Sequence, residues 1–212
     1  MAMAFINSWK LHIEDKIEDV YFLEGVCTHQ DYQRCGLMKK LISYIMNEYK
    51  DKQLALQAYN WDLYRKFGFK ETHYLYSYKL NTIEGSAIVW DKPDPSTMAN
   101  IYNQYVQDKD GYRIHDLSYY KDFFIPYIKA GGMKIKQYHT QGYIVYYKTK
   151  EEIIVRYIHY TNENAYHSML YTLLKEYNKP LLIYSHKGNS SQFALMMYPQ
   201  RHIENAYINE MI

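Results

Sequence analysis

The sequence predicts an α/β (α+β) protein in which two units of strands and helices follow one another in tandem. Stretches rich in β-branched and aromatic residues alternate with amphipathic helical stretches along the 212 residues. Residues 81–95 interrupt this alternation with Gly85, Ser86 and the sequence Pro93-Asp94-Pro95, which is typical of a linker. On each side of the linker, a strand ending at a threonine is followed by a polar turn, a helix and further strands. The two halves therefore share one order of elements.

The first unit, residues 1–82, has the pattern β-β-α-β-α-β. Its expected elements are strands at 1–13 and 17–28, a helix at 37–50, a strand at 54–58, a helix at 61–67 and a strand at 73–80. A charged turn, Glu14-Asp15-Lys16, joins the first two strands. Gly68 follows the second helix in the position where glycine commonly ends a helix.

A linker, residues 83–95, leads to the second unit, residues 96–212. Its expected elements are helices at 96–106, 117–129 and 162–177 and strands at 133–139, 142–148, 152–160, 181–185 and 192–198. Ser96 is predicted to cap the first helix, and Pro126 is predicted to bend or end the second.

Composition and charge exclude several functional classes. Hydrophobic residues make up 48% and charged residues 23%, which is ordinary for a globular protein, and the 27 tyrosines favour a half-buried, β-rich surface. The net charge of +2, with both signs interleaved, predicts no nucleic-acid partner. No apolar run reaches the roughly 18 residues that a membrane span needs, and the N-terminus lacks signal-peptide features. Cys27 and Cys35 fit no CxxC pair, so reduced thiols and a cytoplasmic location are expected.

The segment VCTHQDYQRCGLMKKLISYIM, residues 26–46, passes from a strand through a polar turn into a helix. A phosphate bound at such a turn needs unpaired backbone N–H groups and the positive end of a helix dipole. Gly36 lets the backbone approach a ligand, and Arg34 could add a cation. On spacing alone, however, one glycine before a helix is more often a simple turn.

The same segment resembles the acyl-CoA pyrophosphate signature of the GNAT N-acetyltransferases, Q/R-x-x-G-x-G/A. Gln33 and Gly36 fall on its first and fourth positions, and Met38 stands where glycine or alanine is usual. Downstream, WDLYRKFGFKET resembles the Tyr-x-x-x-Gly-Phe segment of that superfamily through Tyr64 and Gly68-Phe69. The two motifs together are far more specific than either alone.

The remainder of the chain is similar to the second domain of the Eis-like acetyltransferases, in which two GNAT-like units are joined in tandem. The similar segments are WDKPDPSTMANIYNQYV, DGYRIHD, GYIVYYK and the final strand-helix-strand. The resemblance implies that each unit is a mixed, mostly antiparallel sheet flanked by helices, and that the second unit binds no acetyl-CoA. In agreement, residues 161–165 contain no glycine, and capping by Thr161 or Asn162 is a sufficient role for that turn.

The chain departs from this family at both ends. It starts at about the third element, so the strand and two helices that form one wall of the acceptor site are missing, and the C-terminal sterol-carrier-like domain is absent. The catalytic role that the resemblance implies for a C-terminal carboxylate does not transfer to Ile212, because the domain that places it is missing. Since Met1-Ala2-Met3-Ala4-Phe5 reads like the interior of a strand, one hypothesis is that the chain is a shortened form of a longer protein.

The resemblance implies an N-acetyltransferase in which a primary amine attacks acetyl-CoA, the cosubstrate, directly in a ternary complex. Tyr64 matches the general acid of the family, although it could also simply pack its helix against the sheet. Glu24 is a candidate general base, although an acidic residue on a strand is more often just solvated. His29 could orient the loop or act on the amine, but a loop histidine is more often structural.

The expected cofactor contacts come mainly from the backbone. The pantetheine arm would pair with the backbone groups of Val26, Cys27 and Thr28, because a splayed strand offers unpaired donors. The turn that would hold the pyrophosphate consists of Gln33, Arg34, Cys35, Gly36, Leu37 and Met38. Cys35 has no nearby catalytic histidine, and neither an HExxH motif nor a clustered histidine spacing occurs, so neither a thiol nucleophile nor a metal site is expected.

A catalytically inactive GNAT-fold protein, serving as a binding or scaffolding module, is the alternative. If the protein is an enzyme, its acceptor is expected to be a small-molecule or peptide amine. The resemblance to Eis-like enzymes, which are commonly hexameric, also implies a possible homo-oligomer.

Overall fold

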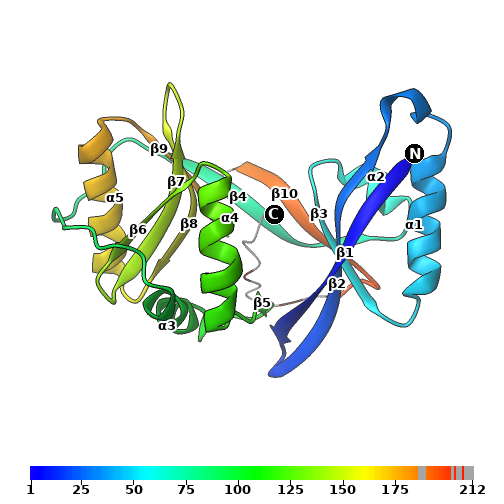
Figure 1. Cartoon of the computed structure of the whole chain (residues 1–212), viewed down its shortest axis with the longest axis horizontal. Helices are drawn as coiled ribbons and strands as arrows, with labels where there is room; N and C mark the ends of the chain where they lie inside the picture. Colours follow the sequence, from blue (N-terminus) through cyan, green and yellow to red (C-terminus); the bar gives the residue numbers. More distant parts are fainter. Residues whose placement is uncertain (186–189, 202, 204–206, 208–212) are drawn as a thin grey trace. The chain divides into compact units, whose positions relative to one another are not determined.

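The computed structural model describes residues 1–185, 190–201, 203 and 207, with the backbone alone at 190–193. The chain divides into two compact units (Figure 1). Unit 1 comprises Met1–Leu75, Lys109–Ile114 and Ser191–Ile212. Unit 2 comprises Tyr76–Asp108 and His115–Ser190. The beginning and the last part of the sequence therefore belong to the same unit.

Unit 1 is a sheet with a helix packed against it. Its elements are β1 (Ala2–Ile13), β2 (Lys16–Thr28), the short 3₁₀ helix η1 (Gln30–Tyr32), α1 (Leu37–Glu48), β3 (Gln53–Ala58), α2 (Trp61–Arg65), the first part of β4 (Lys70–Leu80), β5 (Tyr112–Arg113) and β10 (Ser190–Tyr198). Its strands are ordered β5-β1-β2-β3-β10-β4. The sequence analysis missed η1 and β5, which are too short to show a periodic pattern.

The long hairpin of β1 and β2 begins the unit. Glu14 and Asp15 both have positive φ, 50° and 62°, which is the conformation of a two-residue type I′ hairpin turn. The Asp110 carboxylate accepts a hydrogen bond from the Glu14 N–H at 3.0 Å and so fastens the turn to the segment that carries β5. The charged turn predicted between the first two strands is confirmed.

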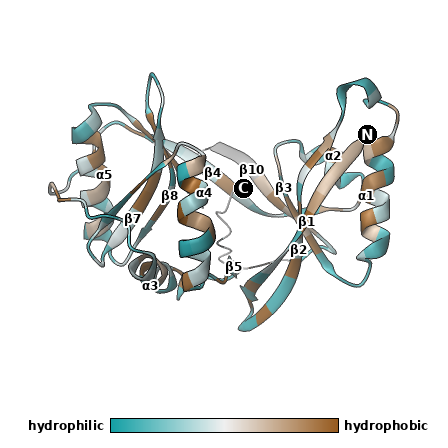
Figure 2. Ribbon diagram, in the orientation of Figure 1, coloured by the Kyte–Doolittle hydropathy of each residue, from teal (hydrophilic) through white to brown (hydrophobic). Residues whose placement is uncertain are grey.

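The hydrophobic core of unit 1 has a layer on each face of the sheet. On one face, Ile42 and Ile45 of α1 pack with Leu23, Leu54 and other buried residues, while the outer side of α1 is hydrophilic (Figure 2). The other face carries a second cluster: Trp9, Leu11, Ile13, Val20, Phe22, Ala55, Leu195, Met197 and Ile203. Both layers together hold the central strands β2 and β3 in place.

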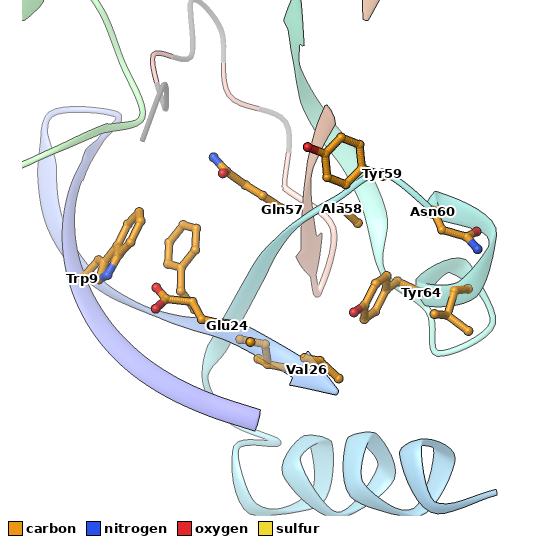
Figure 3. A pocket seen from close by; sticks show the side chains of 12 residues that line it. Trp9, Glu24, Val26, Gln57, Ala58, Tyr59, Asn60 and Tyr64 are labelled. Atoms are coloured by element: carbon orange, nitrogen blue, oxygen red, sulfur yellow. The ribbon is translucent and has the colours of Figure 1, made fainter. Parts of the chain in front are cut away.

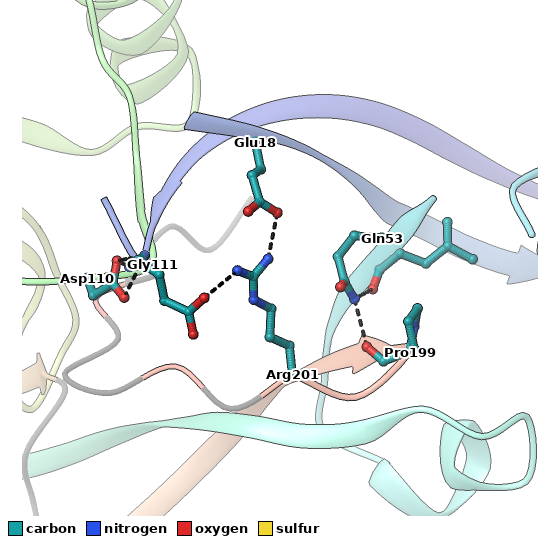
Figure 4. Close-up of polar contacts among 8 residues, drawn as sticks. Glu18, Gln53, Asp110, Gly111, Pro199 and Arg201 are labelled. Carbon is teal, nitrogen blue, oxygen red and sulfur yellow. Dashed lines mark hydrogen bonds and ion pairs between the residues drawn. The ribbon is translucent and has the colours of Figure 1, made fainter. Parts of the chain in front are cut away.

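The last strand, β10, lies between β3 and β4 and pairs antiparallel with β3 from Leu54 to Ala58. The chain after β10 remains attached to unit 1 through polar contacts (Figure 4). The Arg201 guanidinium donates to Glu18 at 2.5 Å and to Glu14 at 2.9 Å, and the Gln53 side chain donates to the Pro199 carbonyl at 2.8 Å. Ile212, to which the sequence analysis assigned no catalytic role, lies outside the described residues.

Unit 2 places helices on both faces of its sheet. Its elements are the second part of β4, α3 (Pro95–Val106), the π-helical segment η2 (Tyr119–Phe124), α4 (Ile125–Ala130), β6 (Lys134–Tyr138), β7 (Gly142–Lys148), β8 (Ile153–Tyr160), α5 (Glu163–Tyr177) and β9 (Leu181–Ser185). The strands are ordered β4-β9-β8-β7-β6, and α4 and α5 lie on opposite sides of them (Figure 1).

Successive side chains on the central strands of unit 2 alternate between two hydrophobic cores, one on each face of the sheet. Ile144 and Tyr146 of β7 pack with Met169 and Leu173 of α5. The neighbouring residue on β7, Tyr143, points to the opposite face, where its hydroxyl hydrogen-bonds to that of Tyr120 at 2.9 Å. Both β7 and β8 are therefore buried along most of their length.

Two helix boundaries differ from the predicted ones. The cap of α3 is Asp94, whose carboxylate accepts from the Thr97 N–H at 2.8 Å, whereas Ser96 lies inside the helix and donates to Asp94. Asp94 is the cap because Pro95 is well suited to the first turn of a helix. In addition, an ionised carboxylate accepts a stronger hydrogen bond than a hydroxyl does. Pro126 does not end its helix: it lies in the first turn of α4, where the chain passes from the π-helical η2 to an α-helix.

The strand pairings of the described residues are mostly antiparallel. The parallel ones join β2 to β3 and β8 to β9, and each of these pairs is connected through a helix, α1 or α5. The predicted α/β fold, a mixed and mostly antiparallel sheet flanked by helices, is confirmed. Among the described residues, no helix is long and apolar enough to cross a membrane.

Candidate functional site

A gap opens between the two parallel strands of unit 1. Pairing between β2 and β3 covers Val20 to Phe22 on β2 and Gln53 to Ala55 on β3, and in the described structure it ends there. Beyond this point β3 keeps its antiparallel partner β10, whereas β2 keeps only β1. In the described structure, the edge of β2 that faces β3 therefore has no strand partner after Phe22.

A β-bulge accompanies the divergence of the two strands. The register shifts between the pairs Met3–Cys27 and Phe5–Glu24, so that Gly25 and Val26 lie opposite the single residue Ala4. Gly25 has a φ of 59°, and a Cβ on it would lie 3.1 Å from the Phe5 ring. Only glycine meets both conditions without strain.

Gly25 is a site residue that the sequence analysis missed. The available signal was an isolated glycine within the strand pattern YFLEGVCT, which typically marks a bulge or a close backbone approach.

The gap holds a pocket of about 500 Å³ (Figure 3). Its lining comes from β1, β2, β3, α2 and the connection between β3 and α2: Trp9, Phe22, Leu23, Glu24, Gly25, Val26, Gln57, Ala58, Tyr59, Asn60, Leu63 and Tyr64. The predicted residues Glu24, Val26 and Tyr64 are thus brought together at one site. Trp9, Phe22 and the β3 residues were not predicted, because their places depend on a strand pairing that the sequence does not display.

Tyr64 reaches the pocket from α2, a single helical turn that several contacts hold in place. The Trp61 indole donates to the Ala58 carbonyl at 2.8 Å, and Arg65 forms ion pairs with Asp62 and Glu71. The Tyr64 ring packs edge-on against Phe69. Burial raises the pKa of the Tyr64 hydroxyl above its ordinary value of 10.0, so the hydroxyl keeps its proton at neutral pH.

Glu24 approaches the same pocket from β2 (Figure 3). The Asn7 side-chain amide on β1 donates a hydrogen bond to its carboxylate at 2.5 Å. Glu24 is the only charged residue in the described lining of the pocket. A proton donor, Tyr64, and a carboxylate therefore line one cavity.

The turn before α1 presents backbone amides to solvent. The first intrahelical hydrogen bond of α1 runs from the Lys40 N–H to the Gly36 carbonyl at 3.1 Å, so the preceding N–H groups have no partner within the helix. Gly36, at φ 75°, occupies the cap position, and a Cβ there would meet nothing within 4 Å. Arg34 is exposed, at φ 63°, and Met38 packs against the core under α1.

The other predicted site residues lie along the path from β2 to this turn. Cys27 and Cys35 are exposed free thiols, and Thr28 is the last residue of β2. His29 caps η1, because its Nδ1 accepts from the Asp31 N–H at 3.3 Å. The structural alternative for His29, orientation of the loop, fits this contact.

The corresponding strand–helix turn of unit 2 is built differently. Pairing of β8 with β9 ends at Val155 and Ile183, in the same manner as in unit 1. The N-terminus of α5, however, is capped by Asn162, whose side chain accepts from the Ala165 N–H at 2.9 Å. Of the two residues offered as caps by the sequence, Asn162 is the one that performs this role. In the described part of the chain, no group of histidine, cysteine, aspartate or glutamate side chains could hold a metal ion.

Comparison with known families gives one match, in the first part of the chain. Residues 1–72 match the acetyltransferase (GNAT) domain. The matched segment includes β1 to α2 and therefore the whole pocket. No curated protein matches the sequence.

Solved structures share the fold over nearly the whole chain. A GCN5-related N-acetyltransferase from Anabaena variabilis superposes with a TM-score of 0.67 at 13% identity, covering 92% of this chain and 58% of that protein. Eis1 from Mycobacterium abscessus gives 0.57 at 15% identity, with 86% and 52% covered. N-myristoyltransferase from Saccharomyces cerevisiae, solved with bound myristoyl-CoA, gives 0.62 at 10% identity, with 95% and 67% covered. The chain thus has a GNAT fold and spans less than two thirds of both bacterial structures.

Proposed function

We propose that the chain is an acetyl-CoA-dependent N-acetyltransferase that acetylates a primary amine. The observation that carries this proposal is the divergence of β2 and β3 beside an uncapped helix N-terminus, inside the segment that matches the GNAT domain. The pantetheine arm would lie along Val26, Cys27 and Thr28, where β2 has lost its β3 partner. The diphosphate would accept hydrogen bonds from the amides between Arg34 and Met38.

The pocket offers groups for both proton transfers. The amine nitrogen attacks the thioester carbonyl and forms the new C–N bond, after which the C–S bond breaks. Glu24 takes the proton that the nitrogen must lose, directly or through water, and Tyr64 protonates the departing thiolate. A raised pKa suits Tyr64 to this role, since the hydroxyl stays protonated until the thiolate forms.

Unit 2 is proposed to be a tandem GNAT-like unit without a cofactor. Its support is the shared order of strands and the capping of α5 by Asn162, which occupies the amide that a phosphate would need. We further propose a cytoplasmic location, in keeping with the free thiols of Cys27 and Cys35. A homo-oligomer is also proposed, and its only support is the resemblance to the Eis-like enzymes.

Thermal unfolding with and without acetyl-CoA tests the cofactor. A ligand of the native state at 100 times its Kd adds about 2.7 kcal/mol of stability, so Tm should rise by several degrees. Release of free CoA with a panel of amines then tests turnover. A Tm shift without turnover would favour an inactive binding module, and no Tm shift at millimolar acetyl-CoA would contradict the proposal.

A further inference from the structure

Apolar side chains on one face of β1 are buried at one end of the strand and exposed at the other. Trp9 is 3% exposed, whereas Phe5 is 56% and Met3 is 38% exposed. All three lie on the same face, with the polar residue Asn7 between Trp9 and Phe5. Phe5 and Met3 therefore form a short exposed apolar row, and exposed apolar surface beside a pocket commonly marks a binding site.

The row borders the pocket. Phe5 is the direct cross-strand partner of Glu24, and Met3 is that of Cys27, which places each pair on one face of the hairpin. The Phe5 ring also covers Gly25, where it would lie 3.1 Å from an added Cβ. Since Glu24 and Gly25 line the pocket, the exposed row forms a continuation of its rim.

The pocket beside this row favours a cation. Glu24 supplies the one charge of the described lining, and the Asn7 amide holds its carboxylate by a hydrogen bond of 2.5 Å. Trp9 and Phe22 stack with ring centroids 3.9 Å apart in the inner wall. The Arg113 guanidinium already lies over the Trp9 ring, 4.3 Å from its centroid, so both faces of that ring are occupied. An ammonium group is therefore suited to this pocket through an ion pair with the Glu24 carboxylate.

We infer that the acceptor is an amphipathic primary amine, whose ammonium group binds at Glu24 and whose alkyl or aryl body packs on Phe5 and Met3. To call this amine the acceptor rests on the proposed function. The inference itself concerns which amines the site binds best. A hydroxylated amine of the same size would leave this apolar row without a partner and would lose the gain from burying it.

The binding preference is measured by ligand-observed NMR on the full chain, with and without CoA. The probes are a series of n-alkylamines of increasing length, ethanolamine and glucosamine as polar amines, and hexanol as an uncharged control. Affinity is expected to rise about twofold to threefold per added methylene, which is below the full transfer value because the row stays partly open to water. Hexanol is expected to bind more weakly than hexylamine.

Substitutions test which residues cause this binding preference. Phe5→Ser and Met3→Ser are expected to flatten the dependence on chain length and to leave ethanolamine unchanged. Glu24→Gln should remove the preference for hexylamine over hexanol. Ile17→Ser is the matched control, because Ile17 is an apolar residue of the same hairpin, 62% exposed, and lies at its turn end away from the pocket.

The outcomes separate this inference from the proposed function. Equal binding of alkyl and hydroxylated amines, or a length dependence that Phe5→Ser and Met3→Ser leave intact, would overturn the inference, even if acetyl transfer occurs. Graded binding that depends on Phe5 and Glu24 would support it. If that binding came without any acetyl transfer, the ligand class would stand and the catalytic proposal would fall.

Discussion

Tyr64 shows how a modest change of environment prepares one side chain for chemistry. The short helix α2 holds the ring half-buried against Phe69, and this burial raises the pKa of the hydroxyl above 10.0. A tyrosine that acts as an acid works in its protonated form, which persists as long as the pH stays below that pKa. The structural alternative, a ring that merely packs its helix, is compatible with the same burial, so only kinetics distinguishes the two.

Replacement of Tyr64 by phenylalanine keeps the ring and removes the proton. We expect kcat to fall by about 10²-fold or more, with little change in acetyl-CoA affinity, because general acid catalysis typically contributes this amount. In the wild type, activity should decline only as the pH rises above 10, and this alkaline limb should be absent from the variant. Unchanged kcat in Tyr64→Phe would show that the ring only packs.

Gly36 permits a comparison of two glycines with the same backbone conformation. Gly36 and Gly132 have φ of 75° and 71°, and a Cβ on either would meet nothing within 4 Å. Alanine at either position should therefore cost a similar amount of stability, about 1–2 kcal/mol, from the left-handed backbone alone. Chemical denaturation measures this cost.

The two variants should differ in cofactor binding. In Gly36→Ala the new Cβ would occupy the space through which a diphosphate approaches the amides of α1, so acetyl-CoA affinity is expected to fall at least about tenfold. Gly132 lies in unit 2, and Gly132→Ala should bind acetyl-CoA like the wild type. Equal affinities of both variants, measured by calorimetry, would remove the turn from the proposed site.

Among the elements, the β1–β2 hairpin and its bulge form the site. The alternation of residues on both strands, their charged turn and the helix after the polar turn could all be predicted, because each has a local pattern. The isolated Gly25 was a sign of the bulge, but the pairing on either side of it could not be predicted, because it depends on the register between two strands. For the same reason the wall formed by Gln57, Tyr59 and Asn60 emerged only when β2 and β3 were seen to part.

Gly25→Ala tests the bulge directly. The substitution introduces strain at φ 59° and a contact of 3.1 Å with Phe5, so the free energy of unfolding should fall by about 1–2 kcal/mol and acetyl-CoA binding should weaken. The double variant Gly25→Ala with Phe5→Ala isolates the two causes, because it relieves the ring contact and leaves the strain. If Gly25→Ala is as stable as the wild type and binds acetyl-CoA equally well, the bulge does not shape the pocket.

At the scale of the molecule, the chain completes its first unit with its last strand. β10 lies between β3 and β4, where Ala194 to Tyr198 pair with Ala58 to Leu54. Such a long-range pairing leaves no trace in local sequence patterns, so a strand near the end of the chain could be predicted but not its place. The π-helical turn of η2 was missed likewise, because its apolar spacing resembles that of an α-helix.

Residues 1–82, the first unit expected from the sequence, test this dependence as an isolated fragment. The fragment lacks β10, so β3 would lose its antiparallel partner and Leu195 and Met197 would leave the core. We expect the fragment to show no cooperative unfolding, and co-expression with residues 83–212 to restore it. Cooperative unfolding of the fragment alone, together with acetyl-CoA binding, would instead establish it as an independent domain.

The site of acetyl-CoA binding can be mapped directly by amide NMR of the ¹⁵N-labelled chain during titration with acetyl-CoA. The largest shifts are expected at residues 23–28, along the open edge of β2, and at residues 34–39, in the turn and first turn of α1. Residues 156–165 of unit 2, where Asn162 caps α5, should change little. Shifts confined to unit 2, or none at saturating acetyl-CoA, would contradict the account.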